Sequence, residues 1–264
     1  MLINLRARLT AAFQQMGGAW VFYTCLPLPA ELPLQFTRIA QWATGIGLAL
    51  GALLGLADFS LGLLQMPLLP RSALIVALWV GLTGGLHLDG AMDTADGLAV
   101  MEPERRLGVM ADSRSGAFGV MVAIIILLLK VCALSAIPGQ RPLVLMLAAA
   151  WGRWGQMVAI ATYPYLKPEG KGAFHRQHLQ LPWDFIPGLI ILMGLASFQV
   201  LTDTPLEAGL TLIAASLISA GTGLWFNQQL SGMTGDVYGA IVEWTEALLL
   251  CVLTLPLLPP TNFI

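Results

Sequence analysis

Residues 117–137 read AFGVMVAIIILLLKVCALSAI, an apolar run in which Lys130 is the one charged side chain. A transmembrane helix needs about 20 consecutive apolar residues, so this stretch is long enough to cross a bilayer. Six further segments have a similar character, at residues 39–58, 72–88, 142–162, 185–202, 207–226 and 237–258. In the first of these spans, glycines recur at every fourth position, 47, 51 and 55, which predicts a close contact with another helix. The sequence therefore predicts an all-α, polytopic integral membrane protein with about seven transmembrane helices, within a range of six to eight.

The composition of the whole chain supports this class. Hydrophobic residues make up 57% of the 264 residues and charged residues 11%, whereas soluble domains carry about 25% charged residues. We therefore expect a single membrane-embedded domain over residues 1–264, with the lipid bilayer as its surroundings. The net charge of −2 provides no basic field that would attract nucleic acid, so we expect no nucleic-acid partner.

The N-terminus and the distribution of basic residues predict how the chain sits in the membrane. Apolar side chains recur at helical spacing over residues 2–16, which predicts an amphipathic interfacial helix that ends at Gly17 and Gly18. With seven spans, most Lys and Arg residues outside them fall on the side of the N-terminus. The positive-inside rule then places the N-terminus and the loops at 89–116, 163–184 and 227–236 in the cytosol.

Acidic residues gather in the segment 83–119. Asp89, Asp93 and Asp96 are spaced i, i+4 and i+7, which places them within roughly 60° of one another on a helix face. Converging carboxylates need positive charge, and hard oxygen ligands suit Mg²⁺, which also keeps positions for water and phosphate. These three aspartates are therefore candidate metal ligands and catalytic groups. The alternative is a solvated acidic loop beyond a helix end.

The neighbouring sequence DSRSGAFG, residues 112–119, has features of a phosphate site. The Arg114 guanidinium offers a planar fork of donors, and small residues at the start of the 117–137 span can turn backbone amides toward an anion. Asp112, Ser113 and Gly116 are accordingly candidates for substrate contacts. The alternative is an ordinary helix cap at Ser115. His87 either packs between helices or contacts the substrate.

Two further segments carry charges that could belong to the same site. In SGMTGDVYGAIVEWTEA, residues 231–247, Asp236 and Glu243 could share a helix face and ligate metal. Alternatively, Glu243 and Glu246, which are one turn apart, could be packing residues bound to Arg153. In the loop 163–178, Lys167 and Lys171 could bind phosphate groups, or only set the topology. The residues alone thus indicate a metal-dependent phosphoryl-group enzyme, with a cytosolic active site built from residues 84–119 and 231–246.

Four stretches resemble a known family in order along nearly the whole chain: GGLHLDGAMDTADGL (84–98), VMADSRSGAFG (109–119), YPYLKPEGKGAF (163–174) and MTGDVYGAIVEWTE (233–246). With the early FYTCLPLP (22–29), they are similar to the cobalamin synthase, or adenosylcobinamide-GDP ribazoletransferase, family. The departures are mild, at Ala91, Met92, Ala111 and Ser115, and none changes an acid or Arg114. The absence of an expected Lys at position 111 puts only a peripheral phosphate contact in doubt.

The resemblance implies a multi-pass enzyme of the bacterial inner membrane that acts late in vitamin B12 synthesis. It would join adenosylcobinamide-GDP to α-ribazole or α-ribazole 5′-phosphate with Mg²⁺ and release GMP. The implied roles are Mg²⁺ binding by the three clustered aspartates with Asp236 and Glu243, phosphate binding by Arg114, and substrate contacts by His87, Asp112, Ser113, Gly116, Lys167 and Lys171. Rival interpretations are a CDP-alcohol phosphotransferase and an ion-coupled transporter, and the sequence leaves open whether the chain forms a homo-oligomer.

Overall fold

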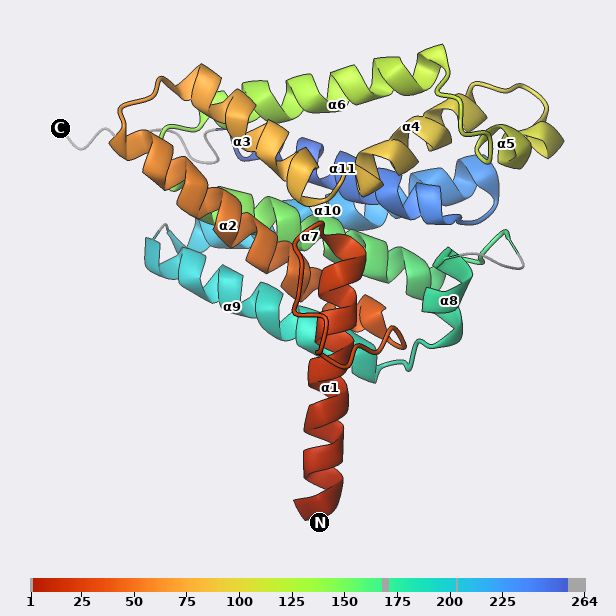
Figure 1. Cartoon of the computed structure of the whole chain (residues 1–264). Helices are drawn as coiled ribbons and strands as arrows, with labels where there is room; N and C mark the ends of the chain where they lie inside the picture. Colours follow the sequence, from red (N-terminus) through yellow and green to blue (C-terminus); the bar gives the residue numbers. More distant parts are fainter. Residues whose placement is uncertain (1, 168–170, 203, 256–264) are drawn as a thin grey trace.

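The computed structural model describes residues 2–167, 171–202 and 204–255, and this part of the chain consists of helices joined by loops, with no β-strand. This confirms the predicted all-α class. The helices, shown in Figure 1, are α1 (Leu2–Tyr23), η1 (Ile39–Trp42), α2 (Ala43–Leu63), α3 (Leu68–Leu82), α4 (Leu86–Leu98), α5 (Pro103–Val109), α6 (Ala117–Ala136), α7 (Arg141–Thr162), α8 (Lys171–Gln177), η2 (Trp183–Phe185), α9 (Ile186–Thr202), α10 (Pro205–Leu230) and α11 (Gly235–Val252).

Within the described residues, five helical segments are long and apolar enough to cross a membrane, so the chain is a multi-pass membrane protein. They are η1 with α2, α6, α7, η2 with α9, and α10. The pair α3 and α4 adds a sixth if it counts as one broken span, because its two helices meet at 89°. The predicted span at 237–258 is not among them: α11 carries three acidic residues and is mostly buried in the bundle, and residues 256–258 lie outside the described residues.

Helix α7 forms the centre of the bundle. Its most apolar stretch is 83% buried by the other helices, whereas the equivalent stretches of the other four spans are 22–39% buried. Helix α2 lies against α7 through Gly47, Gly51 and Gly55, where an added Cβ would lie 2.3–2.8 Å from α7 backbone atoms. This confirms the close helix contact that small residues at every fourth position indicate.

Helix α4 leaves the direction of α3 at Gly84 and Gly85. Both residues have positive φ angles, of 60° and 70°, a conformation that glycine adopts without a steric penalty. After this turn α4 runs between α6 and α11 (Figure 1) and packs against both. The bend therefore packs α4, which carries the clustered aspartates, against α6 and α11 instead of extending the α3 span in a straight line.

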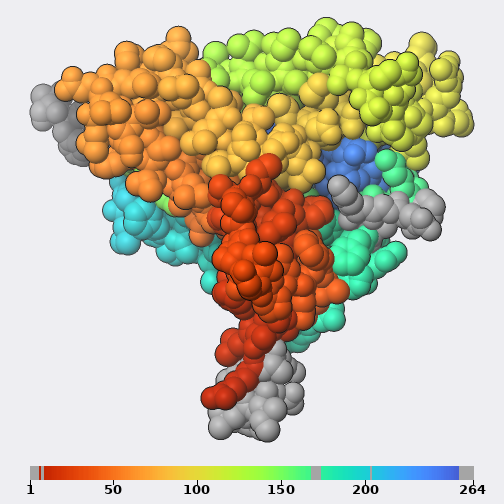
Figure 2. Space-filling model, viewed as in Figure 1, coloured from red at the N-terminus to blue at the C-terminus, as the bar shows by residue number. Residues whose placement is uncertain are grey.

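Helix α1 continues past the predicted end at Gly17 and Gly18 and stops at Tyr23. Its last turns are held in the bundle, where Ala19 and Tyr23 are fully buried. Further back, the backbone N–H of Gln35 donates a hydrogen bond to the backbone carbonyl oxygen of Gln14 at 3.1 Å. The first part of α1 projects from the bundle (Figure 1), while its C-terminal end lies against the α3–α4 region in the space-filling view of Figure 2. Packing thus overrides the glycine stop signal.

Candidate active site

The site forms where α4 and α11 approach each other most closely. A Cβ at Gly90 would lie 2.7 Å from the Asp236 carbonyl oxygen, and one at Gly239 would lie 2.9 Å from the His87 carbonyl oxygen. Glycines at these two positions let the backbones touch. As a result Asp236, at the start of α11, lies on the same cavity as Asp89 of α4 and close to Asp93, the proximity that the sequence motifs suggest.

Carboxylates dominate the charge at this contact. The charges of Asp89, Asp236 and Asp96 all act on the Asp93 carboxylate, which is half-buried, while Asp89 is exposed. The Lys167 ammonium lies 3.3 Å from the Asp236 carboxylate and supplies positive charge. Lys167 is thus part of the site, whereas the side chain of Lys171 lies outside the described residues.

A cavity of about 300 Å³ opens beside these carboxylates. Its walls come from α1, α4, α7, α8, α11 and the loop before α8, and its lining residues are Phe22, Leu86, His87, Asp89, Gly90, Gln156, Tyr165, Lys167, His175, Gly235, Asp236, Tyr238 and Gly239. The cavity therefore joins a charged edge to an aromatic and polar interior.

The sequence did not identify four of these lining residues, Gln156, His175, Tyr165 and Tyr238, as members of the site. No local motif marks them, because they come from elements that meet only in the folded chain. His87 is 1% exposed, lines the cavity and stacks on Tyr23 with ring centroids 6.2 Å apart. It therefore combines the two roles that the sequence left as alternatives, packing and access to the site.

Asp96 takes a different place from Asp89 and Asp93. Its two carboxylate oxygens accept hydrogen bonds from the backbone amides of Gly116 and Gly119, at 2.7 and 2.8 Å. These amides lie at the N-terminus of α6, where the helix dipole favours negative charge. The anion held by the predicted phosphate cradle is therefore the Asp96 carboxylate, and we assign Asp96 to capping of α6 instead of metal binding.

Arg114 and Asp112 form an exposed pair next to this cap. The Arg114 Nη2 atom lies 2.7 Å from the Asp112 carboxylate, and the Arg114 side chain is 87% exposed. Hydrogen bonds from the Arg114 side chain and backbone lower the pKa of Asp112 to about 2. Ser113 is exposed in the same turn. The guanidinium fork predicted to bind phosphate thus faces Asp112 in this structure.

Glu243 belongs to a buried ion-pair cluster that links α6, α7 and α11. The Lys130 ammonium donates to Glu243 at 2.7 Å and also to Glu246, and Arg153 pairs with Glu246. All four side chains are at most 5% exposed. Since its partner is Lys130, we assign Glu243 to helix packing and not to a metal shell. The alternative in which these acids bind Arg153 is confirmed for Glu246.

The structure therefore does not bring all five predicted metal ligands together. Within residues 2–167, 171–202 and 204–255, no three Asp, Glu, His or Cys side chains are placed to hold one metal ion. A complete protein shell is not what Mg²⁺ requires, since it is usually bound by one or two carboxylates together with water and substrate phosphates. The hard oxygen donors of Asp89, Asp93 and Asp236 fit this type of incomplete site.

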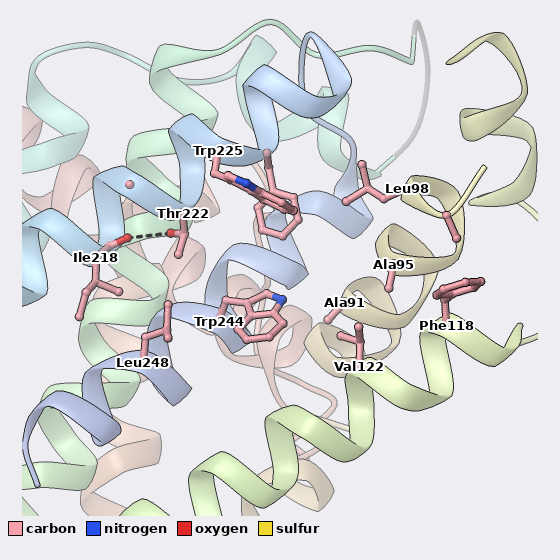
Figure 3. A pocket seen from close by; sticks show the side chains of 13 residues that line it. Ala91, Ala95, Leu98, Phe118, Val122, Ile218, Thr222, Trp225, Trp244 and Leu248 are labelled. Carbon is pink, nitrogen blue, oxygen red and sulfur yellow. Dashed lines mark hydrogen bonds between the residues drawn. The ribbon is translucent and has the colours of Figure 1, made fainter. Parts of the chain in front are cut away.

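A second pocket, of about 670 Å³, lies on another face of α4. Figure 3 shows Trp225 of α10 and Trp244 of α11 on one side of it, with Ala91 and Ala95 of α4 opposite. Among the described residues, its lining contains no charged side chain that could balance a phosphate group. Of these two pockets, the first, beside the carboxylates, is therefore the candidate site for a charged substrate.

Sequence comparison finds known proteins that are similar to this chain over nearly its whole length. The chain is 56% identical over 237 residues to an adenosylcobinamide-GDP ribazoletransferase of Trichormus variabilis, covering 89% of this chain and 94% of the relative. It is 51% identical over 240 residues to the protein of that name from Synechococcus sp., with the same coverage, and 49% identical over 245 residues to that of Synechocystis sp., covering 91% and 94%. No solved structure matches the chain.

The sequence profile described as cobalamin-5-phosphate synthase matches residues 15–254, a range that includes every element of the site. The chain belongs to the cobalamin-5-phosphate synthase family.

Proposed function

We propose that this chain joins adenosylcobinamide-GDP to α-ribazole, or to its 5′-phosphate, and so completes the nucleotide loop of cobalamin. Membership of a family whose members are named adenosylcobinamide-GDP ribazoletransferase carries this proposal. The carboxylate cluster of Asp89, Asp93 and Asp236 beside a cavity supports it, because transfer between phosphate groups depends on positioning and on neutralising charge.

In the proposed reaction the 5′ oxygen of the ribazole attacks the phosphorus that is attached to cobinamide. A new P–O bond forms, the P–O bond to GMP breaks, and GMP leaves with the bridging oxygen. The proton of the attacking hydroxyl passes to a carboxylate of the cluster beside the cavity. Lys167, beside Asp236, offsets the negative charge of the phosphates.

Asp89, Asp93 and Asp236 would hold the Mg²⁺ ion. When bound, Mg²⁺ neutralises charge on the phosphoanhydride oxygens. Arg114 would leave Asp112 and bind a phosphate oxygen through its guanidinium fork, because a phosphate group can replace the carboxylate as a bidentate acceptor.

We further propose that the protein lies in a bacterial inner membrane, with its N-terminus and active site on the cytosolic face. The support is the concentration of basic residues in segments next to the site, at Arg105, Arg106, Arg114, Lys167 and Arg176.

The test uses the full chain in lipid nanodiscs with adenosylcobinamide-GDP, α-ribazole and Mg²⁺, and measures GMP and the corrinoid product by chromatography. We expect product that requires Mg²⁺ and is lost in Asp89→Ala and in Asp93→Ala. Glu104→Ala, which removes an exposed acid of α5, is the matched control and should retain activity. Folded wild-type protein that makes no product with any divalent metal would refute the proposal.

Arg114→Lys tests the phosphate contact separately. The change keeps the charge and removes the fork, so we expect kcat/KM to fall by about tenfold or more. Its thermal stability should equal that of the wild type because the side chain is exposed. Unchanged kinetics would limit Arg114 to its pairing with Asp112.

A further inference from the structure

The interior of the 300 Å³ cavity carries buried polar atoms that have no hydrogen-bond partner among the residues that the structure describes. They are both ring nitrogens of His87, the side-chain oxygen of Gln156, Nδ1 of His175 and the hydroxyl of Tyr238. Each of these four side chains is 4% exposed or less. Buried polar groups without partners are costly, so their concentration along one cavity indicates that a ligand supplies the missing hydrogen bonds.

Aromatic rings surround these polar atoms. Phe22 meets His175 edge to face with centroids 4.9 Å apart, and Tyr165 stacks near Tyr238 with centroids 6.0 Å apart. Burial lowers the pKa of His175 to about 4, so at neutral pH its ring is uncharged and offers one donor and one acceptor. The interior is therefore suited to a neutral ligand that combines a planar ring with several hydroxyl or ring-nitrogen groups, which is the chemistry of a ribonucleoside.

Both substrates of the proposed reaction contain a ribonucleoside, and the position of the carboxylates distinguishes them. Asp89 and Asp236 lie on the lining of the same cavity, so a nucleoside inside it places one end at these carboxylates. The 5′ oxygen of α-ribazole is the reacting atom itself. The guanosine of the donor is separated from the attacked phosphorus by a further phosphate group, so it would lie away from the reaction centre.

We propose that this cavity is the acceptor site and that Gln156, His175 and His87 bind the ribosyl and base groups of α-ribazole there. The proposal rests on the reaction proposed above. The volume of about 300 Å³ is at the lower end of the range for small-molecule sites and suits one nucleoside, not a corrinoid. Specificity for the acceptor is thus determined by residues of α4, α7 and α8.

Two variants test the acceptor site without touching the carboxylates. Gln156→Leu and His175→Phe remove hydrogen-bonding groups and keep similar size. We expect each to raise the Kd for α-ribazole about tenfold, measured by equilibrium dialysis without the donor, and to raise its KM equally. The KM for adenosylcobinamide-GDP should stay within about twofold of the wild type, since the donor lies outside the cavity.

Matched controls come from the same chain. Gln199, 5% exposed in α9, donates to Thr211, and His178 lies one turn after Phe174 and does not line the cavity. Gln199→Leu and His178→Phe should leave both KM values and the Kd unchanged. These controls separate loss of binding from a general loss of folding.

The outcomes separate this inference from the proposed reaction. Wild-type protein that turns over, with unchanged α-ribazole Kd and KM in both cavity variants, would overturn the acceptor site alone. If the cavity variants instead raise the KM for adenosylcobinamide-GDP, the cavity binds the guanosine of the donor, and this result would also overturn the acceptor-site assignment. Wild-type protein that binds α-ribazole through Gln156 and His175 but forms no product would refute the reaction and leave the site assignment standing.

Discussion

The buried ion-pair cluster of Lys130, Glu243, Glu246 and Arg153 permits a quantitative test of what holds α11 in place. The two cations and two anions balance, and at least one member comes from each of α6, α7 and α11. Lys130→Met keeps an unbranched side chain of similar length and removes one positive charge. Glu243 and Glu246 then face Arg153 alone, with one buried negative charge in excess.

Breaking a buried ion pair from one side costs about 3–5 kcal/mol, because the remaining charge is left desolvated. Lys130 also lies 4.6 Å from the centroid of the Trp79 ring, a contact that contributes about 0.5–2 kcal/mol. At about 2 °C per kcal/mol for a chain of this length, we expect the Tm of Lys130→Met to fall by roughly 6 °C or more.

Charge balance predicts a partial rescue. In Lys130→Met with Glu243→Gln, the remaining pair of Arg153 and Glu246 is neutral again, so the double variant should regain about half of the lost stability. The measurement is thermal unfolding followed by tryptophan fluorescence in nanodiscs. Arg105→Met is the control: its ion pair with Glu102 is exposed, and its Tm should stay within about 2 °C of the wild type. A double variant less stable than Lys130→Met would refute the reasoning.

Three further predictions follow from single contacts. Asp96→Ala removes the acceptor for two amides at the start of α6 and should cost about 1–2 kcal/mol in thermal unfolding, whereas Asp96→Asn should cost less. Gly90→Ala places a Cβ 2.7 Å from α11 backbone, so Tm falls and kcat/KM drops about tenfold in the transferase assay; Gly194→Ala, with no atom within 4 Å, should change neither. Burial lowers the pKa of His175 from 6.5 to about 4. Between these two pH values the unfolded chain binds a proton at His175 that the folded chain does not bind, so the Tm should fall from pH 7 to pH 5. In His175→Phe this contribution to the fall in Tm should disappear.

Local patterns predicted the spans and their closest contact. Apolar length identified α2, α6, α7, α9 and α10, and the glycine spacing in α2 indicated a tightly packed partner. Both properties depend on neighbouring residues alone. The number of membrane crossings and the end of α1 depend on tertiary burial instead. In α11, acidic residues lower the hydropathy, but cations from α6 and α7 neutralise two of these acids inside the bundle.

The site was predictable where its charged residues stand in a local sequence motif, as they do in α4 and at the start of α11. The spacing of Asp89 and Asp93 places them on one face, and Asp236 joins them as expected. Gln156 and His175 carry no signal in the sequence because α7 and α8 approach α4 only through the fold. Their functional significance comes from unpartnered buried atoms, a property that exists only in three dimensions.

The hydrogen bonds of Asp96 to α6 explain why the remaining carboxylates are proposed to bind a cation. The sequence presents a row of three aspartates and, separately, a glycine-rich helix start suited to an anion, and the structure pairs one with the other. The α6 amides therefore stabilise the negative charge of Asp96. Asp89, Asp93 and Asp236 receive no such amides from α6, and Lys167 provides one positive charge near three carboxylates. This excess of negative charge beside a cavity would repel a pyrophosphate, and a divalent cation would offset the repulsion. That charge balance is the physical basis for proposing Mg²⁺ at these three residues.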